Sequence, residues 1–309
     1  MTDAVPDSRE SPSSASRAPA LVLSATRMLP PWFARWLGGV LGHAFSLLPM
    51  RDQRRCRDHL RIAFPSADAN WIERTAQKTF RHAGRMALWT LATLDRDARS
   101  LRRGIAVEGA DNIRAVVRAC RRGEGTVAFT GHFGNWELLS RVGATVIPAT
   151  VIGRRLRSAF ADAVVRAARA SGGSRVLYQD DDVRASLREL RSGRMLGVLA
   201  DQDVPRLTGI FVPWFGVPAF TPSAPAALAL MSGGAAQPLF LYERAGRWVI
   251  HAGPRRIFPR GGDRAAAIAE ITAWAMAYEE ALVRRQPHQW VWWHRRWKTR
   301  PSDRPAQKS

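Results

Sequence analysis

The sequence TVAFTGHFGNWE at residues 126–137 constrains this chain more than any other stretch. The apolar run at 127–129 lies between glycines, which predicts a short buried strand. His132 follows this strand, and Asn135 is a good N-cap for a helix that starts at Trp136. The predicted layout is a strand, a turn and a helix N-terminus, with an imidazole where the strand ends.

A carboxylate, Glu137, follows His132 at a spacing of five. On one continuous helix the two residues would lie about 140° apart around the axis, but Gly134 can supply a turn that brings them together. An imidazole beside a carboxylate is the pairing of a general base with the group that orients it. A surface histidine, followed by a glutamate that the helix dipole favours, gives the same spacing. Spacing alone therefore leaves both interpretations open.

The composition limits the class of protein. With 309 residues and 46% hydrophobic content the chain can bury one large core or two small ones. The formal net charge is +21, and 44 of the 47 basic residues are arginine, which suits phosphates, anionic lipid headgroups or an acidic protein. The two cysteines, Cys56 and Cys120, show no metal-ligand spacing and indicate a reducing location.

The N-terminal part divides into a tail and a helix. Residues 1–20 are rich in Ser, Pro and Ala and lack the pattern of a signal peptide, so we expect a disordered tail. Residues 29–49 carry bulky apolar side chains every three to four positions, among them Trp32 and Trp36, with small and polar residues on the other side. This pattern favours a helix that lies in a membrane interface or crosses it once, and an ordinary core helix is the alternative. The basic segment after it favours a cytoplasmic location for the rest of the chain.

Alternating strand and helix patterns predict an α/β fold with a mixed central sheet flanked by helices, preceded by the N-terminal membrane-associated helix. We expect a tail at 1–20, the anchoring helix and a basic linker at 21–60, one catalytic domain at 61–300 and a second tail at 301–309. The expected strands lie at 105–109, 127–129, 149–152, 176–178, 195–200, 239–243 and 248–252. Helices are expected at 69–94, 113–122, 159–171, 183–191 and 264–285.

Five blocks carry a resemblance to a known family. GHFGNWE resembles the His-x4-acid block of the late lipid A acyltransferases, the lauroyl and myristoyl transferases of Gram-negative bacteria, which belong to the wider group of glycerolipid acyltransferases. In the family's order follow a strand that ends at Arg154–Arg155, an Asp201–Gln202 pair, the loop and helix at 209–230 and the C-terminal PHQWVWWHRRWK at 287–298. The resemblance spans about residues 29–298.

The resemblance implies transfer of a fatty acyl group from an acyl carrier protein thioester to a hydroxyl of a lipid A precursor. It implies a bacterial inner-membrane protein whose catalytic domain faces the cytoplasm. The expected partners are acyl carrier protein and an anionic membrane lipid, with no metal, no cofactor and no nucleic acid. We expect direct transfer, since the blocks contain no nucleophile for a covalent intermediate.

The implied catalytic residues are His132 as general base and Glu137 as the residue that orients it. For the oxyanion, the backbone amides at 134–136 and the side chain of Arg154 are alternatives. The expected substrate-binding residues are Arg154, Arg155, Arg169, Asp201, Gln202, Asn135, Arg295 and Arg296. The expected acyl-chain pocket consists of Trp136, Trp214 and Phe215, although the last two suit a plain packed loop equally well.

Two other functions fit the sequence. An acyltransferase of the same group with another acceptor, such as a glycolipid, an aminolipid or an aryl ester, shares every block named above. A basic nucleic-acid-binding protein fits the charge and the tryptophan-rich C-terminus, but it leaves the block around His132 and Glu137 unexplained.

Overall fold

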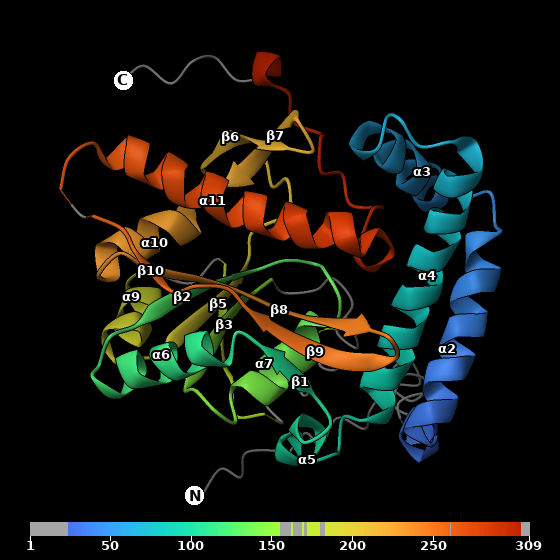
Figure 1. Cartoon of the computed structure of the whole chain (residues 1–309), viewed down its shortest axis with the longest axis horizontal. Helices are drawn as coiled ribbons and strands as arrows, with labels where there is room; N and C mark the ends of the chain where they lie inside the picture. The colour runs from blue at the N-terminus through green and yellow to red at the C-terminus, as the bar shows by residue number, and fades with distance from the viewer. Residues whose placement is uncertain are drawn as a thin grey trace, which may run out of the picture.

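A mixed β-sheet forms the centre of the computed structural model, which describes residues 24–154, 162, 169, 172–179, 183–259 and 261–303 (Figure 1). The strand order is β1-β9-β8-β2-β5-β3-β4, with β10 paired to β8. β8 and β9 form an antiparallel hairpin, whereas β2, β3, β4 and β5 run parallel. The strands are β1 (Ala106–Glu108), β2 (Thr126–Thr130), β3 (Ala149–Gly153), β4 (Arg175–Tyr178), β5 (Met195–Leu199), β8 (Ala235–Arg244), β9 (Arg247–Ala252) and β10 (Arg256–Ile257).

Helices cover both faces of this sheet. On one face lie α9 (Val183–Arg191), α10 (Ala224–Ser232) and α11 (Arg264–Arg285), and on the other lie α6 (Ala110–Arg121) and α7 (Trp136–Gly143) (Figure 1). The central strand β2 is buried along its whole length because Val127 and Phe129 point to the first layer and Ala128 to the second. The predicted α/β fold with a mixed central sheet is confirmed.

The N-terminal helices pack beside the sheet (Figure 1). They are α2 (Pro31–Ser46), α3 (Arg51–Ala63) and α4 (Ala69–Ala92), followed by the short α5 (Ala98–Arg102). The basic stretch that we expected to be a linker is therefore the helix α3, which runs across the expected boundary at residue 60. The predicted helix at 159–171 lies outside the described residues, except for Asp162 and Arg169.

Glycines let α2 and α4 approach each other closely. A Cβ atom at Gly38 would lie 2.2 Å from the backbone oxygen of Gly84, and one at Gly42 would lie 2.2 Å from that of Phe80, so neither position can carry a side chain. The small-residue side of α2 thus faces the protein, and the bulky apolar side faces outward, with Trp32 72% and Trp36 58% exposed. This orientation excludes the alternative of an ordinary core helix.

Within the ranges given above, no helix combines the length and the apolarity needed to cross a bilayer.

The segment at 209–230 differs from the expected loop. It forms a two-stranded antiparallel hairpin of β6 (Gly209–Trp214) and β7 (Val217–Pro222), which leads into α10. After α11 the chain passes through a short 3₁₀ turn, η1 (Pro287–Gln289), and returns across the core, and a second turn, η2 (Pro301–Asp303), follows. This return segment contacts the loop that follows β2, where His132 lies.

Candidate active site

The ends of two neighbouring strands bring His132 and Asp201 together. β2 and β5 pair in parallel with Thr130 opposite Leu199, so the residues that follow them emerge at the same edge of the sheet. Nδ1 of His132 lies 2.8 Å from Oδ1 of Asp201, and the backbone N–H of His132 donates to Oδ2 at 2.7 Å. Asp201 therefore holds both the ring and the backbone of His132.

Asp201 is fully buried and has a third donor. The indole N–H of Trp290 donates to its Oδ2 atom at 2.9 Å. Burial opposes ionisation of Asp201, but the charge and hydrogen bonds of His132, with a smaller contribution from His294, lower the pKa of Asp201 below its usual range. An ionised Asp201 accepts a hydrogen bond from the Nδ1–H of His132, which leaves the lone pair of Nε2 as the basic atom.

Gln202 and His294 contact the same ring. The side-chain amide nitrogen of Gln202 lies 3.0 Å from Nε2 of His132 and 3.1 Å from Nδ1 of His294. The centroids of the two imidazole rings are 4.7 Å apart. Burial and the neighbouring His132 lower the pKa of His294 to about 3, so this second histidine is neutral near pH 7.

A second carboxyl group lies behind Asp201. Glu279 of α11 is completely buried, and its Oε1 atom would lie 1.8 Å from a Cβ atom at Gly131, the residue before His132. Within the described part of the chain, neither carboxyl oxygen of Glu279 has a partner with good hydrogen-bond geometry. Burial and the negative charge of Asp201 raise the pKa of Glu279 well above its usual value, which favours its protonated form.

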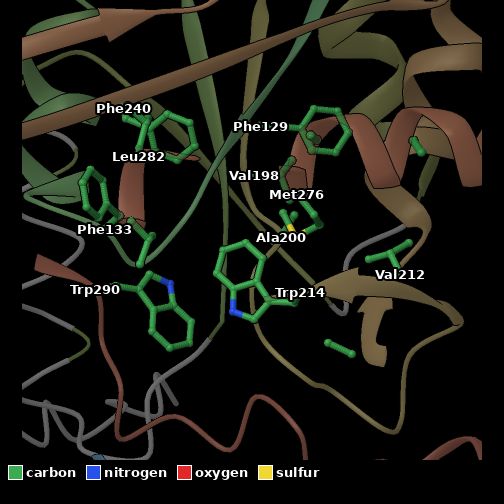
Figure 2. Close-up of a cluster of buried hydrophobic side chains, with 14 of the residues drawn as sticks. Phe129, Phe133, Val198, Ala200, Val212, Trp214, Phe240, Met276, Leu282 and Trp290 are labelled. Atoms are coloured by element: carbon green, nitrogen blue, oxygen red, sulfur yellow. The ribbon is translucent and has the colours of Figure 1, made fainter. Parts of the chain in front are cut away.

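The C-terminal return segment holds the loop around His132 in place. The backbone N–H of Gly134 donates to the Gln289 carbonyl at 2.9 Å, and that of Val291 donates to the His132 carbonyl at 3.2 Å. Between them Trp290 packs against Trp214, with ring centroids 5.7 Å apart, in the core below the site (Figure 2). The tryptophan-rich C-terminus thus supports the site from inside the protein.

The turn between β2 and α7 forms as predicted. Gly134 has a φ of 64°, and a Cβ atom there would lie 2.0 Å from the Leu241 carbonyl oxygen. The Asn135 side chain accepts from the backbone N–H of Leu138 at 2.9 Å, and α7 begins at Trp136. Asn135 is buried and serves as this cap, and it also lines a cavity between α4 and the loop around His132.

Glu137 does not contact His132 as expected. Its carboxylate makes a bidentate pair with Arg169, at 3.0 Å to Nε and 2.8 Å to Nη2. A Cβ atom at Gly153 would lie 2.5 Å from Nη1 of Arg169, so glycine at the end of β3 makes room for this guanidinium. The partner of His132 is Asp201. The pairing of β2 with β5, and not the spacing in the sequence, decides which carboxylate reaches the ring.

Three cavities meet at Trp136 and Glu137. A cleft of about 500 Å³ contains His132, Gln202 and Arg169 on its walls. An apolar cavity of about 250 Å³ lies between the sheet and α7, and another of about 380 Å³ lies between α4 and the loop around His132. Trp136 and Glu137 line all three, so this pair lies at the junction between them.

The other predicted arginines separate into two groups. Arg154 is exposed and lines the cleft, whereas Arg155 lies outside the described residues. Arg295 is exposed on the return segment, but Arg296 is fully buried and donates to the Phe220 carbonyl at 2.7 Å. Arg296 therefore ties the return segment to β7 and does not face the cleft.

Two of the three residues expected in an acyl-chain pocket lie elsewhere. Trp214 is fully buried in the core, and Phe215, in the turn of the β6–β7 hairpin, donates its backbone N–H to Glu280 at 2.7 Å (Figure 2). Their apolar side chains fill space beneath α11, because the segment folds as a hairpin and not as an open loop. Trp136 alone among the three lines the cavities.

The comparison with known proteins decides the family. The family model of the bacterial lipid A biosynthesis acyltransferases matches residues 15–299. The chain belongs to this family. It is therefore an acyltransferase, and its reaction belongs to lipid A biosynthesis.

Two relatives from Escherichia coli (strain K12) match over most of their length. The acyltransferase is 26% identical to a lipid A biosynthesis palmitoleoyltransferase over 271 residues, which are 86% of this chain and 85% of that protein. It is also 26% identical over 307 residues to a lipid A biosynthesis lauroyltransferase, with 92% of this chain and 97% of that protein covered. The named relatives differ in the acyl group that they transfer.

Sequence reasoning missed Trp290 and Glu279 at the acyltransferase site and took His294 only as a secondary binding candidate, in the cluster at 294–296. Trp290 and His294 lie in the C-terminal block that resembles the family, but their contacts with Asp201 and Gln202 depend on how the chain returns. Glu279 is one glutamate in an Ala-rich helix, and only the packing of α11 places it behind Asp201. Asp201 itself was expected at the site, but as a substrate-binding residue.

Proposed function

We propose that this acyltransferase moves a fatty acyl group from an acyl carrier protein thioester to a hydroxyl of a lipid A precursor, with His132 as the general base. One observation carries the proposal. Asp201 holds Nδ1 of His132, and this leaves Nε2 as the basic atom on the wall of a cleft that adjoins an apolar cavity. A base at such a junction suits the reaction of a polar hydroxyl with a lipid-like acyl group.

In the proposed reaction Nε2 of His132 takes the proton of the acceptor hydroxyl as its oxygen attacks the thioester carbonyl. Asp201 stabilises the imidazolium that forms. When the tetrahedral intermediate collapses, the C–S bond breaks and His132 returns the proton to the departing thiolate. The amide of Gln202 occupies the position next to Nε2, so the incoming hydroxyl displaces it.

The oxyanion requires donors on the other side of the carbonyl. The backbone N–H groups of Gly134 and Asn135 already donate to the carbonyls of Gln289 and Leu241, which removes two of the three amides expected for this task. We therefore assign the role to arginine. Arg169, fixed by Glu137 on the wall of the cleft, is held in one orientation, and Arg154 lies on the same wall. In this account Glu137 acts through Arg169.

The apolar cavity between the sheet and α7 suits the donated acyl chain. Most of its walls are aliphatic side chains from β1, β2, β3, β5, β8, β9 and α7, and it adjoins the cleft at Trp136 and Glu137. A chain that enters there places its carbonyl carbon near His132 and its methyl end under β9 and β1. The depth of this cavity then sets the preferred chain length.

The outward apolar face of α2 supports attachment to a membrane surface. Trp32, Trp36, Leu41 and neighbouring apolar side chains are exposed along one side of a helix whose other side is packed on α4. A lipid acceptor requires access from a membrane, and the basic helix α3 adds attraction to anionic lipid. We propose the cytoplasmic face of the bacterial inner membrane as the location.

A panel of acceptors tests the proposal. Purified enzyme is incubated with acyl carrier protein thioesters of different chain length and one of several acceptors: a tetra-acylated lipid A precursor, a glycolipid, an aminolipid or an aryl alcohol. We expect a mass increase of one acyl group on the lipid A precursor. Acylation of another acceptor, with none of the precursor, would replace the acceptor assignment.

A further inference from the structure

A second apolar cavity, distinct from the proposed acyl-chain cavity, lies between α4 and the loop around His132. Its volume is about 380 Å³, and its walls include Ala83, Met86 and Ala87 of α4 and Trp293 of the return segment. It shares Trp136 and Glu137 with the cleft, so the two adjoin at this pair. Transfer to a hydroxyl of an acylated lipid involves the donor chain and at least one chain of the acceptor, and the first cavity accounts for only one of them.

A cationic cavity adjoins this apolar one. It is about 400 Å³ in volume, its walls include Lys78, Arg81 and Arg85, and it shares His82, His288 and Gln289 with the apolar cavity. Arg85 pairs with Glu243 at 3.3 Å. Over the ranges that the structure covers, Lys78 and Arg81 have no carboxylate partner, so the cavity carries net positive charge suited to a phosphate group.

A buried polar atom lies where the two cavities meet. His82 is 6% exposed, and its Nε2 atom is buried without a hydrogen-bond partner among the described residues. Burial lowers the pKa of His82 to about 3, so the ring is neutral near pH 7. In the tautomer that carries its proton on Nδ1, toward the neighbouring backbone of Gly134, Nε2 keeps a lone pair for a ligand hydroxyl.

We propose that these two cavities form the binding site of a phosphorylated, acylated acceptor lipid, with one acyl chain in the apolar cavity and a phosphate on Lys78 and Arg81. The proposal rests on the proposed function. It adds the place from which the acceptor approaches, because a chain in this cavity leads past His82 to the junction at Trp136 and Glu137. The acceptor then reaches His132 from the α4 side, and the donor chain lies beneath α7.

Binding without turnover separates this proposal from the reaction itself. His132→Ala protein is titrated, in detergent and without donor, with a diphosphorylated tetra-acylated glucosamine disaccharide and with its dephosphorylated form. We expect the phosphorylated lipid to bind about tenfold more tightly than the dephosphorylated one, or tighter still, because charged hydrogen bonds contribute at least that much free energy. Lys78→Gln combined with Arg81→Gln abolishes that preference.

Arg74→Gln is the matched control, because Arg74 is exposed on the same helix and lines neither cavity. The Arg74→Gln variant should keep the preference for the phosphorylated lipid if the phosphate binds at Lys78 and Arg81. Equal losses in the control and the double variant, or no preference in the parent protein, would overturn the proposal and indicate general attraction between a basic surface and anionic lipid. Binding to vesicles of anionic phospholipid, measured with the same proteins, distinguishes that attraction from the site.

A cavity-filling variant tests the apolar half. Ala87→Phe places a ring at an exposed edge of the apolar cavity, and Ala83→Phe fills it more deeply. Both should weaken binding of the tetra-acylated lipid about tenfold while thermal unfolding of Ala87→Phe stays unchanged. Unaltered lipid affinity in both folded variants would place the acyl chain elsewhere.

Discussion

Nδ1 of His132 and Oδ1 of Asp201 lie 2.8 Å apart, although 69 positions of sequence separate the two residues. The contact exists because β2 and β5 are neighbours in the sheet and end at the same edge. It assigns the proton of the neutral imidazole to Nδ1 and leaves Nε2 to accept a proton. Glu137, which the sequence pairs with His132, instead fixes Arg169.

We expect Glu137 and Arg169 to act as one unit. Glu137→Ala releases Arg169, and Arg169→Ala removes the guanidinium, so each change should lower kcat/KM about 10- to 100-fold for the same reason. The double variant should then be little worse than either single variant. Steady-state acyl transfer by the four proteins measures the coupling, and additive losses would show that the two residues act separately.

The acyl-chain cavity predicts a change in specificity. Gly197 of β5 lines it, and a Cβ atom there would meet only Val151 at 3.4 Å and the Thr150 oxygen at 3.8 Å. Gly197→Leu therefore projects into the cavity and should shift the preferred donor to a shorter chain, whereas Ile250→Ala should shift it to a longer one. Competition among thioesters of different length measures both, and an unchanged preference in both variants would remove the donor chain from this cavity.

The outward face of α2 predicts that substitutions there weaken membrane binding without destabilising the fold. Trp32→Glu combined with Trp36→Glu removes two exposed apolar side chains and should reduce sedimentation with anionic vesicles about tenfold or more. The stability should change by about 0.5 kcal/mol or less for each exposed position. Ile257→Glu, at an exposed site on β10, is the control. Vesicle binding that survives the double change would assign attachment to another surface.

The buried acid Glu279 predicts a pH-dependent stability difference. In the unfolded chain it ionises above about pH 4.5, whereas in the folded protein burial and Asp201 raise its pKa. Between the unfolded and the folded pKa, folding takes up a proton, and the stability that Glu279 contributes falls by about 1.4 kcal/mol for each unit by which the pH rises. Glu279→Gln removes this loss, so the variant should gain stability relative to the parent protein between pH 5 and pH 8.

Urea denaturation of both proteins at pH 5, 6.5 and 8 gives this difference directly. Comparison with the parent protein is necessary because His82 and His294 have an opposite effect on the pH dependence of stability. Their pKa values in the folded protein are about 3, so they lower the stability as the pH falls below about 6.5. A Glu279→Gln variant that is less stable at all three pH values would mean that Glu279 is ionised and paired with Arg296.

Local sequence signals predicted most elements of the fold. Apolar runs marked β2, which lies between Gly125 and Gly131, and β5, and Asn135 marked the start of α7. The hairpin of β6 and β7 was missed because its prolines and glycines are also typical of an irregular loop. The basic stretch before Ala63 was taken as a linker because its charge outweighed its helical periodicity, although that helix buries Cys56 and Leu60.

The parts of the site that lie in one sequence segment were predictable, and the contacts between distant segments were not. His132 and the turn after it follow from a single stretch of sequence. The role of Asp201, the support from Trp290 and the position of Glu279 depend on strand order and on the return of the C-terminus, which no local pattern reports. Trp214 and Arg296 were expected at the site for their residue types, but packing places both in the core.

The rate of acyl transfer by Asp201→Asn protein tests the central claim most directly. Asparagine keeps the shape of the side chain but no longer favours the proton on Nδ1, so kcat should fall about a thousandfold or more, toward the level of His132→Ala. The control for local folding is Asp203→Asn, two residues after Asp201. This change alters the contact of Asp203 with Thr299 and should retain most activity. Near-normal kcat in folded Asp201→Asn protein would contradict the assignment of His132 as a base positioned by Asp201.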